Sequence, residues 1–276
     1  MATEPVQAVP VQSGYASVND LEMYYEIHGT GAPLVVVHGS FMSTGTMSGL
    51  VQPLAATRQV IAVDLQAHGR TADRDLPLNY AQMADDVAAL LDVIGVGKAD
   101  VFGYSMGGAV AQQVAIRHPE RVNKLVLLST AFSLDGWYPE VIAGIAQITP
   151  QVFAGSPIES EYQRIAPQPE HFPALVKKVV ALNSESFNWS AEIAGLQSPA
   201  LIMLGDSDGV RPEHAAEMFR LFGGGVFGDY AGLPKSRFAV LPGATHVTVM
   251  FQVDRLVSMI NDFLDPQPAP QFPPAQ

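Results

Sequence analysis

The chain contains no cysteine among its 276 residues. This absence excludes disulfide bonds, thiolate zinc sites and a cysteine nucleophile. The chain also lacks any apolar run near the ~18 residues that a membrane span requires. Its first residues have neither the basic nor the apolar region of a secretory signal. We therefore expect a cytoplasmic protein that does not bind membranes.

Positive charge is scarce, because 15 Lys and Arg stand against 27 Asp and Glu, for a net charge of −12. Nucleic acids and anionic membrane surfaces bind stripes of Lys and Arg, so neither is expected as a partner. Charged residues make up only 15% of the chain and hydrophobic residues 48%, which is typical of a packed globule. The expected partner is a small molecule, and the oligomeric state stays open.

Proline marks both ends of the chain, with two prolines in residues 1–14 and five in residues 265–276. Proline-rich polar ends cannot build a packed core. We therefore expect a flexible N-terminal tail at 1–14 and a C-terminal tail at 265–276. The remainder is expected to form one core from residues 15–130 and 199–264, interrupted by an insertion at 131–198.

Short apolar segments alternate with helical patterns between these ends. The continuous apolar run at 33–38 predicts a buried strand. In residues 80–96, apolar side chains recur at helical spacing along one face: Met83, Val87, Leu90, Leu91 and Ile94. Asn19-Asp20 predicts the turn of an antiparallel hairpin at 15–27. The alternation predicts an α/β protein with a mostly parallel sheet and helices on both faces.

Residues 131–198 break this alternation. They show no clean strand pattern but contain scattered aromatic residues: Phe132, Trp137, Tyr138, Phe153, Tyr162, Phe172, Phe187 and Trp189. Because loops this long without secondary structure are uncommon in compact domains, we expect an α-helical cap. Trp137 and Tyr138 are candidates to wall a substrate pocket. For most of the aromatic residues, packing of the cap onto the core is the alternative.

The segment Gly103-Tyr-Ser105-Met-Gly107 matches the pattern G-x-S-x-G. A strand pattern precedes it and a helical pattern follows, which is the context of a nucleophile elbow, a sharp strand-to-helix turn. The free N–H groups and the dipole at a helix N-terminus favour negative charge there. We interpret Ser105 as a nucleophile; the alternative is a glycine-rich turn with an incidental serine.

A serine hydroxyl needs an adjacent base to become a strong nucleophile. In chains with this elbow, the acid and then the base follow the serine, which leaves two late histidines. His214 lies inside a helical pattern, where a surface position is expected, whereas His246 lies in a loop that can reach the site, so His246 is the predicted base. Asp206 and Asp208 both follow the strand pattern at 199–205. We predict Asp208 as the acid, because it lies further into the loop, and Asp206 as a tie for the turn.

Residues 38–41 follow the first strand of the predicted parallel sheet. Gly39 lets the backbone turn so that the next N–H points at a substrate. The sequence therefore predicts an oxyanion hole made by the backbone N–H groups of Ser40 and Met106. His38 is interpreted as a buried packing histidine that orients this loop, and Phe41 is a candidate substrate contact.

These motifs together resemble the α/β-hydrolase superfamily over about residues 21–264. The resemblance is carried by Gly-Tyr-Ser105-Met-Gly-Gly and by five further segments: His38-Gly39, Asp64-Leu-Gln-Ala-His-Gly-Arg-Thr71, His118-Pro-Glu-Arg-Val, Gly205-Asp-Ser-Asp208 and Leu241-Pro-Gly-Ala-Thr-His246. It implies an eight-stranded-type sheet with a helical cap, and Ser105, Asp208 and His246 as a catalytic triad. Two departures are Ala67, where the family motif has glycine, and the glycine-rich segment 223–233.

The residues and the resemblance predict a serine hydrolase that cleaves carboxylic esters or related acyl compounds such as lactones through an acyl-enzyme. No metal or cofactor is expected, since the chain has neither a His-Glu-x-x-His motif nor a complete dinucleotide fingerprint. The same triad could pass the acyl group to hydrogen peroxide, as perhydrolases of the cofactor-free haloperoxidase type do, or cleave a carbon–carbon bond. A non-catalytic ligand-binding member of the fold is a further alternative.

Overall fold

The computed structural model describes residues 11–266 of the chain. Eight strands form one sheet in the order β1-β2-β4-β3-β5-β6-β7-β8. The two pairings that involve β2 are antiparallel, and all the others are parallel. The strands are β1 (Val11–Val18), β2 (Leu21–His28), β3 (Ala32–Val37), β4 (Arg58–Val63), β5 (Ala99–Tyr104), β6 (Val122–Leu128), β7 (Ala200–Ser207) and β8 (Arg237–Thr245). The prediction of a mostly parallel α/β sheet is confirmed.

The leading hairpin turns at Asn19 and Asp20, whose φ angles of 43° and 64° lie in the left-handed region that a two-residue hairpin turn requires. The turn lies where the sequence places it, but β1 begins earlier than expected. Val11 already pairs with His28, so residues 11–14 belong to the sheet and not to the N-terminal tail. Their polar sequence shows no strand pattern because β1 is an edge strand, stabilised by pairing with β2. The remaining residues of the N-terminal tail, and residues 267–276 of the C-terminal tail, lie outside the described residues.

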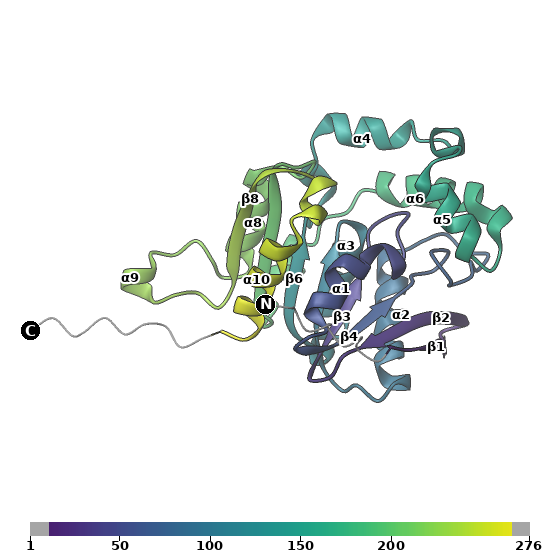
Figure 1. Ribbon diagram of the computed structural model, residues 1–276. Helices are drawn as coiled ribbons and strands as arrows, with labels where there is room; N and C mark the ends of the chain where they lie inside the picture. The colour runs from purple at the N-terminus through teal and green to yellow at the C-terminus, as the bar shows by residue number, and fades with distance from the viewer. Residues whose placement is uncertain (1–10, 267–276) are drawn as a thin grey trace, which may run out of the picture.

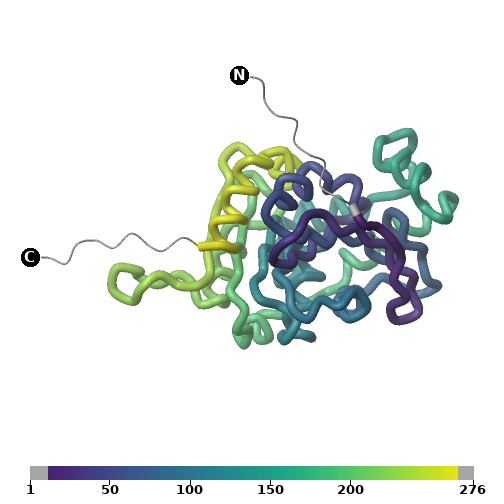
Figure 2. The backbone as a smooth tube through the Cα atoms, turned by 60° about the horizontal axis from the view of Figure 1, so that its bottom comes forward, coloured from purple at the N-terminus to yellow at the C-terminus, as the bar shows by residue number. Residues whose placement is uncertain are grey.

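Helices cover both faces of the sheet. Leu34 and Val36 of β3 belong to a buried cluster with α1 (Ser48–Leu54) and α10 (Val253–Leu264). Val35 and Val37 belong to a cluster on the opposite face with α2 (Tyr80–Val93), α3 (Met106–Arg117) and α8 (Pro212–Leu221). This alternation is expected of a strand that is buried on both faces. Helices α1 and α10 lie side by side although they come from opposite ends of the chain (Figure 2).

The segment between β6 and β7 is helical, as the sequence analysis expects. It contains α4 (Pro139–Ala146), α5 (Pro157–Ile165), α6 (Phe172–Ser184) and α7 (Ser190–Ala194). Figure 1 shows α4, α5 and α6 together beyond one end of the sheet, at the top of the view. Phe41, which follows β3, packs against Phe153 with ring centroids 4.8 Å apart. Tyr138 N donates to Gly209 O, after β7, at 3.0 Å. The helices therefore lie over the carboxyl ends of the parallel strands.

Short 3-10 helices complete the description: Gly45–Met47, Pro119–Arg121, Leu134–Gly136, Pro150–Phe153, Pro169–His171 and Thr248–Phe251. The glycine-rich segment before β8 forms an arm, defined here as residues 223–236, which includes α9 (Gly228–Ala231) and projects from the body in both views (Figures 1 and 2). Tyr230 in this arm is 91% exposed, and Phe227 and Leu233 are each 72% exposed.

Candidate active site

Ser105 lies in the turn between β5 and α3 and has φ 53° and ψ −117°. Few residues other than glycine adopt a positive φ, and such strain is found most often at functional sites. The surrounding hydrogen bonds hold the turn, because Ser105 N donates to Leu128 O at 2.9 Å and Gly108 N donates to Ser105 O at 2.9 Å. The serine is therefore fixed at the N-terminus of α3, where the helix dipole favours negative charge.

The glycines of the turn allow α3 to pack directly on the backbone of the sheet. A Cβ atom on Gly103 would lie 2.2 Å from Gly107 O, and a Cβ atom on Gly107 would lie 2.3 Å from Val37 O. Both distances are far shorter than any real contact, so neither position accepts even alanine without a shift of the backbone. This explains why the turn contains glycine on both sides of Ser105.

The structure brings Ser105, His246 and Asp208 together. His246 Nε2 lies 3.0 Å from Ser105 Oγ, and His246 Nδ1 lies 2.8 Å from Asp208 Oδ1. The three residues directly follow β5, β8 and β7, so parallel strands deliver them to one edge of the sheet. The Asp208 side chain is buried, whereas the His246 side chain is 26% exposed. The imidazole therefore lies between a buried carboxylate and an accessible hydroxyl.

Asp208 accepts hydrogen bonds at both carboxylate oxygens. Oδ1 accepts from Val210 N at 3.1 Å, and Oδ2 accepts from Ser129 Oγ at 2.5 Å and from Gly205 N at 3.3 Å. Burial raises the pKa of Asp208, but the hydrogen bond and charge of His246, together with the Ser129 and Val210 donors, outweigh it and hold the pKa below its ordinary value. Asp208 is therefore ionised at neutral pH.

Ser129 was not identified from the sequence. It directly follows β6 and has a left-handed φ of 52°. A polar residue that ends a parallel strand was the available sign, but only the order of the strands shows that β6 lies beside β7 and so places Ser129 against Asp208.

Asp206 makes different contacts from Asp208. Its Oδ2 accepts from Gly243 N at 2.9 Å and its Oδ1 accepts from Ala244 N at 3.2 Å. The hydrogen bond from Gly243 is the main reason that the pKa of Asp206 lies below its ordinary value. Asp206 therefore ties the end of β7 to the segment that leads into His246, the structural role that the sequence analysis expects of it.

Two aromatic residues contact the His246 ring. Tyr104 stacks against it with centroids 5.4 Å apart, and its hydroxyl donates to His246 O at 2.7 Å. Trp137, from the start of the helical insertion, meets the ring edge-on at 5.3 Å. Tyr138, the other aromatic candidate for the pocket, precedes α4 and is 40% exposed. The contact of Tyr104 with His246 could not be predicted from the sequence, because the residue before the serine is variable in the G-x-S-x-G pattern.

His38 is fully buried and has the packing position expected of it. Its Nδ1 donates to Gly39 O at 2.8 Å, which leaves Nε2 to accept from Leu65 N at 3.1 Å. Burial lowers the pKa of His38 to about 3, so the ring stays neutral. The side chain therefore joins the loop after β3 to the loop after β4.

The expectation of a surface position for His214 was wrong. His214 is 3% exposed, its ring stacks on Phe132 with centroids 3.9 Å apart, and its Nε2 accepts from Phe132 N at 3.2 Å. It lies on the buried face of α8 with Ala215 and Met218. The sequence of α8 alone does not show that this face is buried, because the insertion that covers it begins at a distant point of the chain. His214 anchors the start of that insertion to α8.

The amides of Ser40 and Met106 are the donors predicted for an oxyanion hole. Gly39 packs on Tyr104, the residue before Ser105, so closely that a Cβ atom on Gly39 would lie 2.9 Å from the tyrosine ring. Within residues 11–266, neither the Ser40 nor the Met106 amide donates a hydrogen bond to a backbone acceptor in this loop or turn. Phe41 continues the turn with a left-handed φ of 63° and contacts the helical insertion through Phe153.

Among residues 11–266, no group of three or more His, Asp or Glu side chains is arranged to hold a metal ion. Over the same range, no helix combines the length and the apolar character needed to cross a bilayer.

Comparison with known proteins gives consistent matches. A family model described as alpha/beta hydrolase fold matches residues 32–178. "Putative carbamate hydrolase RutD" of Azorhizobium caulinodans is 27% identical over 272 residues, covering 90% of this chain and 97% of that protein. An enol-lactonase from Burkholderia xenovorans LB400 superposes with a TM-score of 0.68 at 22% identity, covering 91% of this chain and 99% of that one. A carboxylesterase from Bacillus subtilis superposes with a TM-score of 0.72 at 18% identity, covering 94% and 93% of the two chains. The two structural matches show the shared fold.

Proposed function

The chain belongs to the alpha/beta hydrolase fold family, and from this premise we propose that it is a serine hydrolase of carboxylic esters or related acyl compounds such as lactones. The observation that carries the proposal is the pair of hydrogen bonds that joins Asp208 to His246 and His246 to Ser105. The carbamate hydrolase, lactonase and carboxylesterase that the chain resembles are named for substrates that all contain a carbonyl carbon open to nucleophilic attack.

In the proposed reaction, Ser105 Oγ attacks the carbonyl carbon while its proton passes to His246 Nε2. Asp208 accepts the Nδ1 hydrogen, which leaves Nε2 free to accept the proton and stabilises the imidazolium that forms. The ionised state of Asp208 suits this role, because a protonated carboxyl group would not stabilise the His246 imidazolium.

The carbonyl oxygen becomes an oxyanion in the tetrahedral intermediate. We assign its stabilisation to the N–H groups of Ser40 and Met106, aided by the N-terminus of α3. Loss of one such donor typically costs about 3 kcal/mol of transition-state stabilisation. When the intermediate collapses, the bond to the leaving oxygen breaks and His246 returns its proton to the alkoxide. Water, deprotonated by the same imidazole, then attacks the acyl-enzyme, releases the acid and regenerates Ser105.

The helical insertion at 131–198 is proposed as the cap of the substrate site. Trp137 contacts the His246 ring, and Phe153 contacts Phe41 beside the proposed oxyanion donor Ser40. The cap therefore contacts two parts of the proposed site. One is His246, which protonates the leaving group, and the other is the loop that carries the oxyanion donor Ser40. Trp137 and Phe41 are the side chains we expect to touch substrate.

The test compares Ser105→Ala with Ser207→Ala in a chain-length series of p-nitrophenyl esters, a panel of lactones and fluorophosphonate labelling. Ser105→Ala is expected to lower kcat by at least about 10⁴-fold and to abolish labelling, with an unchanged circular dichroism spectrum. Ser207 is a matched control, because this exposed serine is close in sequence to Asp208, and among the described residues its hydroxyl bonds only to Asp206. Ester turnover that survives in Ser105→Ala would refute the mechanism.

A further inference from the structure

The peptide unit between Gly39 and Ser40 has the proposed oxyanion donor, Ser40 N–H, on one side and Gly39 O on the other. This unit is planar and trans, so its N–H and C=O groups point in opposite directions. A group that holds the carbonyl oxygen therefore also sets the direction of the N–H. Gly39 O accepts two hydrogen bonds, from His38 Nδ1 at 2.8 Å and from Met42 N at 3.2 Å.

The His38 ring is held at both of its nitrogen atoms. Because Gly39 O can only accept, Nδ1 carries the hydrogen, and in a neutral ring this leaves the lone pair on Nε2. Leu65 N donates to that lone pair at 3.1 Å. The side chain is fully buried, and burial lowers the pKa of His38 to about 3, so the ring is neutral at physiological pH. The ring is therefore fixed in one tautomer and one orientation.

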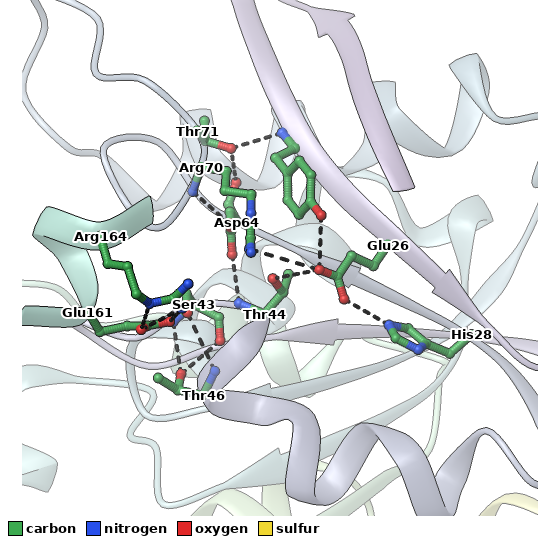
Figure 3. Close-up of polar contacts among 11 residues, drawn as sticks. Glu26, His28, Ser43, Thr44, Thr46, Asp64, Arg70, Thr71, Glu161 and Arg164 are labelled. Carbon is green, nitrogen blue, oxygen red and sulfur yellow. Dashed lines mark hydrogen bonds and ion pairs between the residues drawn. The ribbon is translucent and has the colours of Figure 1, made fainter. Parts of the chain in front are cut away.

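The carboxylate of Asp64 fixes the two loops that the His38 ring joins (Figure 3). Its Oδ1 accepts from Thr44 N, in the loop after β3, at 2.6 Å, and its Oδ2 accepts from Arg70 N, in the loop after β4, at 2.7 Å. Asp64 directly precedes Leu65, the donor to the His38 ring. Both loops are thus fixed before a substrate binds, as a preorganised site requires.

Gly39 itself does little to stop the peptide unit that follows it from turning over. A glycine adopts backbone conformations that other residues do not, so rotation of this unit meets little steric resistance. In the reversed orientation, the partial negative charge of Gly39 O would replace the Ser40 N–H and would repel an oxyanion. Glycine is nevertheless required here, because a Cβ atom would lie 2.9 Å from the Tyr104 ring. The orientation of the unit therefore depends on the hydrogen bonds to Gly39 O, of which the bond from His38 is the shorter.

We propose that His38 is a positioning residue for the reaction, whose Nδ1–H holds the peptide unit in the orientation that directs the Ser40 N–H at the substrate oxygen. The inference rests on the proposed function and adds to it a residue that does not touch the substrate. The same hydrogen bond polarises the peptide unit, which strengthens its N–H as a donor. Loss of the Nδ1 donor should therefore weaken binding of the transition state and leave binding of the substrate nearly unchanged.

Two substitutions separate the roles of the two ring nitrogen atoms. His38→Asn places an amide nitrogen near the Nδ1 position, so it keeps the donor to Gly39 O and loses the acceptor for Leu65 N. His38→Gln places an amide oxygen near the Nε2 position, so it keeps that acceptor and loses the donor. Both variants remove the ring and one hydrogen bond, so each is the packing control for the other.

The experiment compares p-nitrophenyl hexanoate with its thiono analogue, in which sulfur replaces the carbonyl oxygen. Sulfur is a weak hydrogen-bond acceptor, so the oxygen-to-sulfur ratio of kcat/KM measures what the oxyanion donors contribute. His38→Gln should lower this ratio about tenfold, through kcat, which is less than the loss of a whole donor because Met42 N still holds Gly39 O. His38→Asn should keep most of the ratio. Asp208→Asn, which impairs the base, should lower both rates and leave the ratio unchanged.

A second measurement uses the wild-type protein and does not depend on the folding of any variant. Hexylboronic acid bonded to Ser105 presents a negatively charged oxygen to the proposed donors. The peptide unit polarised by this oxygen should strengthen the hydrogen bond from His38 to Gly39 O. The Nδ1 proton of His38 should therefore shift downfield when the boronic acid binds, as measured by NMR with isotope-labelled histidine.

An equal ratio in His38→Gln and the wild-type protein, an equal loss in the two His38 variants, or an unmoved Nδ1 resonance would overturn this inference. None of these results would touch the proposed function, provided that p-nitrophenyl hexanoate is hydrolysed and Ser105 is labelled. Failure of the proposed function is a separate result, in which no ester is hydrolysed and fluorophosphonate does not react with Ser105.

Discussion

At the scale of single residues, two aspartates two positions apart hold different parts of the site. Asp208 contacts the His246 ring, whereas Asp206 contacts the backbone before it. Asp208→Asn is expected to lower kcat by about 10⁴-fold, because an amide no longer holds the working tautomer or stabilises the imidazolium.

Asp206→Asn is the matched control. It keeps one acceptor for the backbone N–H groups of Gly243 and Ala244, so kcat should fall only a few-fold. The kcat of both variants is measured with the same p-nitrophenyl ester. A larger loss of kcat in Asp206→Asn than in Asp208→Asn would show that Asp206 is the acid.

Some of the contacts in the site could be predicted from the sequence, and others could not. Ser105, Asp208 and His246 each carry a local sign, a tight turn or a position after a strand, and the structure joins all three. Ser129 also follows a strand, but this position alone does not identify its partner, and His214 carries no local sign. Their partners depend on the order of strands and on where the insertion folds back, and neither is encoded in a short segment of sequence.

At the scale of elements, the contact between α3 and the sheet depends on the absence of side chains. Gly107→Ala would drive a Cβ atom into Val37 O, so we expect a large loss of stability and a displaced Ser105. Gly144→Ala in α4 is the control, since no atom of residues 11–266, apart from the neighbouring backbone of its own helix, lies within 4 Å of its Cβ position. There, the gain in helix propensity should raise the free energy of unfolding by about 0.5–1 kcal/mol. Thermal unfolding of both variants checks the contrast, and equal shifts would contradict it.

The periodic elements were predicted well and the interrupted ones less well. The helix expected at 80–96 is present as α2. Apolar residues at helical spacing also predict a helix near 247–264, but this segment is divided at Gln252 into a 3-10 helix and α10. Strand β8 runs past Leu241 through Pro242 and Gly243, which normally end a strand. It continues because β8 lies at the edge of the sheet and the Asp206 carboxylate accepts the next two N–H groups.

At the scale of the whole molecule, buried histidines should make stability fall in acid. Burial lowers the pKa of His38 to about 3 and the pKa values of His68 and His214 to about 4, so each resists protonation in the folded state. Their contribution is fully present above pH 6.5 and is lost as the pH falls toward 4. Burial raises the pKa of Asp64 to about 6, so this group stabilises the folded state as the pH falls below 6. The effect of this one group is smaller than the opposite effect of the three histidines.

Near pH 5, the protein should therefore bind about two protons through these four groups when it unfolds. Each proton bound changes the free energy of unfolding by about 1.4 kcal/mol per pH unit. Urea unfolding between pH 4 and pH 7 measures this slope. His214→Gln keeps an acceptor for Phe132 N but cannot titrate, so it should reduce the slope by about one proton near pH 5. An unchanged slope would mean that His214 titrates alike in both states.

The arm at 223–236 has a consequence for the covalent chain. Tyr230, at its tip, lies between Asp208 and His246 in sequence, so one chymotryptic cut there would place the acid and the nucleophile on one fragment and the base on the other. Strand β8 is paired with β7, and α10 lies beside α1, so the two fragments should remain associated. We expect a nicked protein that elutes from a gel-filtration column at its original volume, shows two bands on a denaturing gel and still turns over esters. Loss of activity on cleavage at Tyr230 alone would contradict this, whereas retention would show that strand pairing holds the site together without a covalent link through the arm.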